Sequence, residues 1–209
     1  MFLASYIGRR VWKDNYTDIK GDLMKVGLFG GTFDPPHKGH FVIGKTVKEK
    51  LDLDEVWFIP TYEPPHKDEA TASPDDRLRM LERMIDGEDG LFISTIEFDR
   101  EGRSYTIDTV KALQELHPDV AFYFIIGGDQ IAYLPNWYQI EELKDLVQFI
   151  GVRREGYSYT KPDQVQMVEI PDLPYSSTSI RKGLQQNEPV EGLQKDVERY
   201  IRENHLYER

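Results

Sequence analysis

The stretch Lys25–His40 reads KVGLFGGTFDPPHKGH and holds the features that decide the fold. An apolar run leads into Gly30 and Gly31, and two histidines, His37 and His40, follow three residues apart. A short continuous apolar run is typical of a strand buried on both faces of a sheet, and adjacent glycines permit a sharp turn after it. The stretch therefore predicts a buried strand, a glycine-rich loop and the start of a helix.

Outward from this stretch, apolar runs alternate with helical patterns as far as the C-terminus. Further strands are expected at 55–60, 91–99, 120–127, 147–154 and 164–170. Helices are expected at 40–51, 73–85, 104–118, 136–146, 176–186 and 190–207, with Ser73 and Asn136 as caps of the second and fourth. Alternation of this kind predicts a single α/β domain with one doubly wound, mainly parallel sheet and C-terminal helices.

Composition narrows the class of protein. The chain has 209 residues, which suits one domain, and no cysteine, which excludes disulfides and suits a reducing cytoplasm. A formal net charge of −11 argues against a nucleic-acid scaffold, which normally carries a basic surplus. No segment approaches the ~20 apolar residues of a membrane span. We expect a cytoplasmic protein that binds neither nucleic acid nor membrane.

Residues 1–23 show neither helical nor strand periodicity and are interpreted as an N-terminal extension of the domain at 24–209. The extension could be an arm, a leader or the product of a start codon placed too far upstream. The last is favoured, since Lys20-Gly21-Asp22 can be encoded by a purine-rich stretch just ahead of Met24.

The glycine-rich loop would lie where doubly wound sheets bind ligands, beyond the carboxyl end of the first strand. Its spacing matches neither G-x-G-x-x-G nor the P-loop. A zinc site of Asp34, His37 and His40 lacks an evident fourth ligand, so no metal ligands are assigned. We expect the helix after the loop to direct free N–H groups into the same space. Taken alone, the loop could equally be a turn with two surface histidines.

A second motif, PYSSTSIR, favours the functional interpretation. It places Ser176, Ser177 and Thr178 at a helix start, where hydroxyls and N–H groups meet anions. Arg181 follows about one turn later and can grip the same anion with its guanidinium group. Two anion-binding motifs in one α/β domain indicate a site for a phosphorylated ligand.

Together, GGTFDPPHKGH and SSTSIR resemble the His-x-Gly-His nucleotidyltransferases and, within them, the bacterial nicotinate-nucleotide adenylyltransferases. Further matches are FIPTYEPPHK, YTIDTV, IIGGD, LPNWY and YIRENHLY. The resemblance covers the chain from Met24 onward and implies a Rossmann-like nucleotidyltransferase fold. It also implies transfer of the adenylyl group of ATP to nicotinate mononucleotide, giving deamido-NAD and pyrophosphate, with Mg²⁺ bound mainly through the substrate phosphates.

The resemblance also implies roles for individual residues at the ATP side. His40, His37, Arg181 and Lys45 are the expected catalytic residues, with His40 as the main donor to the α-phosphate. The attacking phosphate oxygen is already anionic, so no general base is needed and the task is positioning and charge stabilisation. The remaining residues expected to bind ATP are Gly30, Gly31, Thr32, Phe33, Gly127, Asp129, Ser177 and Thr178.

For the acceptor, Trp137 is expected to stack on the cationic pyridine ring. The backbone N–H groups of Thr106 and Tyr138 would bind the nicotinate carboxylate. Two alternatives remain open: another adenylyl- or cytidylyltransferase of the superfamily, such as pantetheine-phosphate adenylyltransferase, and a non-catalytic nucleotide sensor. The oligomeric state is also open, with a homodimer as one option.

Overall fold

The structure is a computed structural model and describes residues 23–63, 70–100, 105–154 and 164–208. Apart from Leu23, the N-terminal extension lies outside the described residues. Among the described residues, no helix is long and apolar enough to cross a membrane.

The centre of the molecule is a six-stranded sheet in the order β3-β2-β1-β4-β5-β6, and every neighbouring pair is parallel. The strands are β1 (Met24–Gly31), β2 (Glu55–Pro60), β3 (Leu91–Ile93), β4 (Val120–Gly127), β5 (Gln148–Arg154) and β6 (Val165–Ile170). The expectation of a doubly wound sheet is confirmed, and the sheet is wholly parallel among the described residues.

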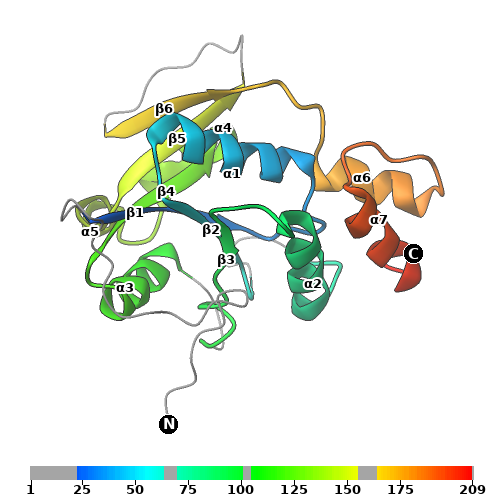
Figure 1. Cartoon of the computed structure of the whole chain (residues 1–209), viewed down its shortest axis with the longest axis horizontal. Coiled ribbons are helices and arrows are strands. Elements are labelled where there is room, and N and C mark those ends of the chain that lie inside the picture. The colour runs from blue at the N-terminus through cyan, green and yellow to red at the C-terminus, as the bar shows by residue number, and fades with distance from the viewer. Residues whose placement is uncertain (1–22, 64–69, 101–104, 155–163, 209) are drawn as a thin grey trace.

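Helices cover both faces of the sheet, so the fold has three layers (Figure 1). One face carries α1 (Lys38–Leu51), α2 (Pro74–Ile85), α6 (Ser177–Gln185) and α7 (Lys195–Glu203). The other carries α3 (Thr106–Leu116), α4 (Gly128–Tyr133), the 3₁₀ turn η1 (Leu134–Asn136) and α5 (Ile140–Leu146). In Figure 1, α6 and α7 gather at one end of the molecule, beside α2.

The apolar strands are continuous runs because each one faces a core on both sides. In β2, Val56 and Phe58 belong to the core under α1 and α2, whereas Trp57 and Ile59 belong to the core under α3 and α5. All four side chains are at most 1% exposed. This two-sided burial is the physical reason why EVWFIP lacks the polar alternation of a half-exposed strand.

Several expected boundaries are wrong. The strand expected at 91–99 ends at Ile93, because this edge strand pairs only with β2 and the chain then turns, with Phe98 N donating to Thr95 O. Asn136 does not cap α5, since it ends η1 and Gln139 occupies the cap position. The short helix α4 was not expected, and the last helix begins at Lys195 rather than near residue 190.

The strand order contains one switch point, between β1 and β4. After β1 the chain adds β2 and β3 on one side, and it then crosses to place β4 on the other. Leu28 pairs with Phe124, and each strand runs on to a glycine, Gly31 and Gly127. Ligands bind at such switch points because the two loops diverge and open a crevice. The fold therefore brings two glycine-rich strand ends side by side at its predicted binding edge.

One prediction concerns the contact between α1 and the sheet. A Cβ at Gly44 would lie 2.7 Å from Cζ of the buried Phe58. Alanine normally stabilises a helix interior by ~1 kcal/mol relative to glycine, but overpacking a core costs about 1–3 kcal/mol. We expect Gly44→Ala to lower the urea unfolding midpoint. The double variant Gly44→Ala/Phe58→Leu should lose less unfolding free energy than the losses of the two single variants added together. A raised midpoint for Gly44→Ala would contradict the contact.

Candidate active site

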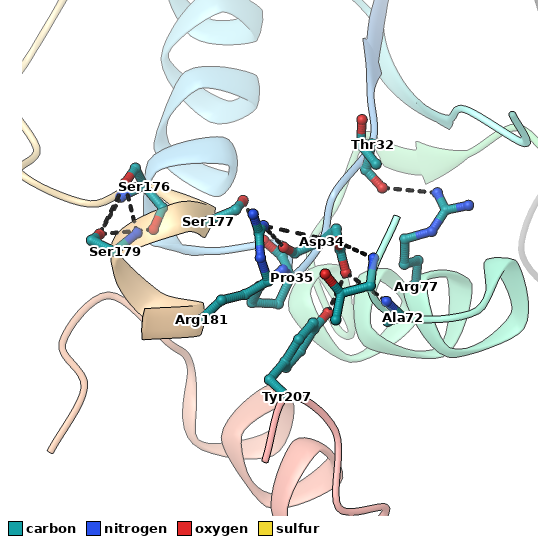
Figure 2. Close-up of polar contacts among 11 residues, drawn as sticks. Thr32, Asp34, Pro35, Ala72, Arg77, Ser176, Ser177, Ser179, Arg181 and Tyr207 are labelled. Atoms are coloured by element: carbon teal, nitrogen blue, oxygen red, sulfur yellow. Dashed lines mark hydrogen bonds and ion pairs between the residues drawn. The ribbon is translucent and has the colours of Figure 1, made fainter. Parts of the chain in front are cut away.

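The candidate site is built by the loop after β1 and by the N-termini of α1 and α6. The loop is fastened to α6 by two hydrogen bonds, from Ser177 Oγ to Pro35 O at 2.9 Å and from Arg181 Nη1 to Asp34 O at 2.6 Å. Figure 2 shows these side chains reaching from α6 to the loop. The two motifs that the sequence analysis paired, residues 30–40 and 176–181, are therefore in direct contact although about 140 residues separate them.

His37 and His40 form a reciprocal cap at the start of α1. His37 Nδ1 accepts from the N–H of Gly39 at 3.1 Å, and His40 Nδ1 accepts from the N–H of His37 at 3.2 Å. Their rings stack with centroids 3.8 Å apart. The glycine between them is required, because a Cβ at Gly39 would lie 2.8 Å from the His37 ring. The His-x-Gly-His spacing is thus a helix cap made of two imidazoles.

This cap sets the tautomer of both rings. With Nδ1 accepting a hydrogen bond, a neutral imidazole carries its proton on Nε2. Burial lowers the pKa of His37 from 6.5 to about 4, so this ring is neutral near pH 7. The His37 ring is therefore prepared to donate from Nε2, and the cap geometry orients the His40 ring in the same way; donation of this kind is what an anionic ligand requires.

The expectation of free N–H groups at the start of α1 is wrong. Lys38 N donates to Gly192 O at 2.7 Å, and Gly39 N donates to the His37 ring. The next two amides, of His40 and Phe41, both donate to His37 O. Since the chain uses these amides itself, histidine side chains are the donors that this helix start offers.

The two glycines of the loop serve different purposes. A Cβ at Gly31 would lie 3.0 Å from the ring of Phe33, which folds back into the core at 2% exposure. Phe33 takes a left-handed backbone conformation, with φ of 52°, and its ring packs on His40 at 5.0 Å. A Cβ at Gly30, by contrast, would meet only Phe124 Cζ, at 3.4 Å. Internal packing thus explains Gly31, whereas the space above Gly30 fits the expected approach of a ligand.

Arg181 lies between Asp34 and the outside of the loop. Its Nη1 donates to the backbone of Asp34 and lies 3.8 Å from Asp34 Oδ2, and its side chain is 28% exposed.

Ser177 and Thr178 occupy the first turn of α6. The Ser177 hydroxyl is engaged with Pro35 O, while Thr178 is exposed. The capping box of α6 is made by Ser176 with Ser179, so the first two amides of the helix have no intrahelical partner, as in any helix.

Asp34 is a structural centre of the site that the sequence analysis considered only as a zinc ligand. Its carboxylate is 7% exposed and accepts from Thr71 N at 2.8 Å, Ala72 N at 3.1 Å and the Tyr207 hydroxyl at 2.7 Å (Figure 2). A buried carboxylate is tolerated only when donors surround it. Asp34 thereby ties the loop to the start of α2 and to the C-terminus.

Arg77 is a second supporting residue that sequence reasoning missed. It is fully buried, and its guanidinium donates to Thr32 O at 2.9 Å, Thr61 O at 2.8 Å and Tyr62 O at 3.2 Å. Burial lowers its pKa, opposed mainly by the charge of Asp34. A signal was present: Arg77 lies on the same helical stripe as Met80, Leu81 and Met84, which form the buried face of α2. A cation on an apolar stripe indicates a buried partner. No comparable pattern in the sequence marks Tyr207 as a partner of Asp34.

The segments predicted to bind the acceptor lie close together. The ring of Tyr105, just before α3, lies 5.0 Å from that of Tyr138. Thr106 is the first residue of α3, where amides lack intrahelical partners. Trp137 is half-buried and packs edge-on against Phe124 and Phe149. Its place between core and surface fits both a packing role and the predicted stacking on a ligand.

Other predicted residues are placed less clearly. Lys45 is half-exposed and pairs with Glu88 at 3.1 Å, so its predicted contact with phosphate competes with an ion pair. Gly127 and Gly128 lie at the junction of β4 and α4, and a Cβ at Gly128 would approach only Val152 O, at 3.7 Å. The side chain of Asp129 lies outside the described residues.

The described residues do not provide a metal site of their own. Within 23–63, 70–100, 105–154 and 164–208, no group of three His, Cys, Asp or Glu side chains could hold an ion. Asp34 is surrounded by donors, and His37 and His40 use Nδ1 in the cap. The zinc interpretation therefore remains unsupported, and the site offers cations and N–H donors to an anion instead.

The buried His37 generates a prediction about stability. The unfolded chain binds a proton on this ring below pH 6.5, but the folded chain does so only near pH 4. The stability that the neutral ring contributes is therefore present above pH 6.5 and lost as the pH falls toward 4. The loss should be roughly 3 kcal/mol. In His37→Asn, which keeps a capping acceptor without a titrating ring, the unfolding free energy should fall less over this range. If the unfolding free energies of both proteins, measured in urea at each pH, fell by the same amount between pH 6.5 and 4, the assignment would be refuted.

Comparison with known proteins agrees with this geometry. A family model described as Cytidylyltransferase-like matches residues 28–183. A relative from Halalkalibacterium halodurans, curated as a probable nicotinate-nucleotide adenylyltransferase, is 51% identical over 190 residues, covering 88% of this chain and 92% of the relative. A relative of the same description from Oceanobacillus iheyensis is 46% identical over 186 residues, covering 88% and 97%.

A solved structure supports the fold independently. The Plasmodium falciparum nicotinic acid mononucleotide adenylyltransferase in complex with NaAD is similar with a TM-score of 0.77. The similarity covers 88% of this chain and 97% of that one, at 23% identity, and therefore concerns the fold. The site geometry, the family model and the relatives that match along nearly their whole length lead to one assignment: the chain belongs to the nicotinate-nucleotide adenylyltransferase family.

Proposed function

We propose that this protein transfers the adenylyl group of ATP to nicotinate mononucleotide, producing deamido-NAD and pyrophosphate in NAD biosynthesis. A phosphate oxygen of nicotinate mononucleotide attacks the α-phosphorus of ATP and forms a new P–O–P bond. The bond between the α-phosphorus and the oxygen that bridges the α- and β-phosphates breaks, and pyrophosphate leaves. The observation that carries the proposal is the direct contact between the His-x-Gly-His loop and α6, in a chain whose relatives are named for this activity.

The donor side is assigned to groups that stabilise negative charge. Nε2 of His40 would donate to the α-phosphate as charge builds on it, and the neighbouring neutral ring of His37 would add a second donor. Arg181 and the first amides of α6 would bind the β- and γ-phosphates. Gly30 would leave room for the phosphate chain. Because the attacking oxygen is already anionic, these groups orient and stabilise, and none has to remove a proton.

The acceptor is assigned to the segments around Tyr105 and Tyr138. Trp137 would stack on the pyridinium ring of nicotinate mononucleotide, and the N–H groups of Thr106 and Tyr138 would bind its carboxylate. The contact between the Tyr105 and Tyr138 rings supports this assignment, since it holds the two expected carboxylate donors in neighbouring segments.

We propose that Mg²⁺ arrives with ATP and is held by phosphate oxygens and water, as is common for this ion. It would neutralise phosphate charge. We further place the reaction in the cytoplasm, and size-exclusion chromatography would decide the homodimer.

The test of the function is an assay of pyrophosphate release with ATP and one acceptor at a time. We expect kcat/KM to be highest with nicotinate mononucleotide and at background with 4′-phosphopantetheine, which lacks a pyridine carboxylate. Equal or greater turnover of phosphopantetheine would overturn the assigned acceptor. ATP binding without turnover of any acceptor would indicate a nucleotide sensor.

The role of His40 can be tested separately. We expect His40→Ala to lower kcat by ~100- to 1000-fold, the usual effect of losing one transition-state donor, while ATP binding by calorimetry changes little. His205→Ala is the matched control, since His205 is exposed, lies far from the loop in the sequence and pairs with its near neighbour Glu208. Unchanged turnover in His40→Ala would refute its role.

A further inference from the structure

The C-terminal end of the chain returns to the loop after β1. Tyr207 is 5% exposed, and its hydroxyl donates to Asp34 Oδ1 at 2.7 Å. Figure 2 shows the ring rising from the C-terminal segment toward the Asp34 carboxylate, on the side of the loop that also faces Arg181. A tyrosine two residues from the end of the chain thus contacts the segment on which phosphate binding depends.

This contact is one of four hydrogen bonds that join the described C-terminal residues to residues 34–38. Lys38 N donates to Gly192 O, Ser177 Oγ to Pro35 O, Arg181 to Asp34 O, and the Tyr207 hydroxyl to the Asp34 side chain. Three of the four involve main-chain atoms of the loop. Of these four hydrogen bonds, the one from Tyr207 goes to the Asp34 carboxylate, whose other oxygen forms an ion pair with Arg181 Nη1 at 3.8 Å.

We propose that Tyr207 is a positioning residue for adenylyl transfer: by donating to Asp34, its hydroxyl keeps the 3.8 Å ion pair between Asp34 and Arg181 from tightening, so that Arg181 is left to bind the ATP phosphates. The inference rests on the proposed function and adds to it a residue 26 positions beyond Arg181 in the chain.

The physical argument is a competition for donors. Asp34 Oδ1 receives hydrogen bonds from Ala72 N and Tyr207, while Oδ2 receives one from Thr71 N. A buried carboxylate that loses a donor draws on the nearest cation to compensate. The nearest guanidinium with an exposed part is that of Arg181, already hydrogen-bonded to the Asp34 backbone. Without the tyrosine hydroxyl, the ion pair between Arg181 Nη1 and Asp34 Oδ2, which is 3.8 Å long in the structure, would tighten at the expense of the phosphate contact.

The hydroxyl is suited to this role over the whole working range of pH. Burial, the hydrogen bond to Asp34 and the charge of Asp34 raise the pKa of Tyr207 above its ordinary value. The group therefore remains a protonated donor, and the contact does not switch near neutral pH.

A purely structural role for the contact must be separated from a positioning role. The chain offers a matched control, because the Tyr200 hydroxyl donates to Asp76 Oδ1 at 2.9 Å, joining α7 to α2. Tyr200→Phe removes the same kind of bond, from a tyrosine hydroxyl to an aspartate, without touching the loop. A loss of stability alone should therefore appear in both variants, whereas a loss of ATP affinity should appear only in Tyr207→Phe.

The experiment measures steady-state kinetics for both substrates in Tyr207→Phe and Tyr200→Phe. In Tyr207→Phe we expect KM for ATP to rise about ten-fold, in line with the loss of a hydrogen bond to a charged group, and KM for nicotinate mononucleotide to stay within about two-fold. Tyr200→Phe should match the wild type in both constants. Wild-type KM values in Tyr207→Phe, or equal changes in the two KM values, would overturn the positioning role.

A double-mutant cycle with Arg181→Ala identifies the residue through which Tyr207 acts. Arg181→Ala alone should raise KM for ATP, and adding Tyr207→Phe should then change it by less than about two-fold. If the tyrosine change has its full effect in that background, the route through Arg181 is wrong although the proposed function stands. If Arg181→Ala itself leaves ATP kinetics unchanged, the assignment of Arg181 fails first, and the inference fails with it.

Discussion

The buried carboxylate of Asp34 is the constraint on which the rest of the site depends. An ionised group with so little contact with water is stable only if the fold supplies donors from all sides. Here they come from Thr71 and Ala72 before α2, and from Tyr207 at the end of the chain, with Arg181 close by. The loop after β1 can therefore take its shape only when α2, α6 and the C-terminal segment are packed. The candidate site is therefore completed by residues from the last third of the chain.

The two histidines also combine a structural task with a chemical one. A helix start usually binds phosphate with its free amides, yet the first amides of α1 are used by the chain itself. His37 and His40 cap the helix with Nδ1, so that a neutral ring at either position carries its proton on Nε2. The structural bond thus selects the tautomer that the chemistry requires. The buried Arg77 also stabilises the site, since its guanidinium donates to three carbonyls of the loops after β1 and β2.

Much of the fold was predictable because its strands are buried on both faces. The bounds of β2 and β4 coincide with the apolar runs, and Ser73 caps α2 as its position before Pro74 suggests. Predictions failed where the local signal and the tertiary context diverge. The apolar pattern continues past Ile93, but pairing with β2 ends at Phe58, since the chain then turns away, with Phe98 N donating to Thr95 O. Asn136 is a good cap by type, yet Pro135 favours a 3₁₀ turn there and the helix starts later.

The sequence by itself determined the parallel α/β class, the edge of the sheet at which a ligand is expected and the two motifs proposed to bind phosphate, because these depend on periodicity and on residue types with narrow chemical uses. Only the tertiary structure decided how the motifs meet. It placed Ser177 and Arg181 on the loop, occupied the amides of α1, paired Lys45 with Glu88 and brought Tyr207 to Asp34. The reason is physical: hydrogen bonds between residues more than a hundred positions apart arise from packing, which leaves no periodic mark in the chain.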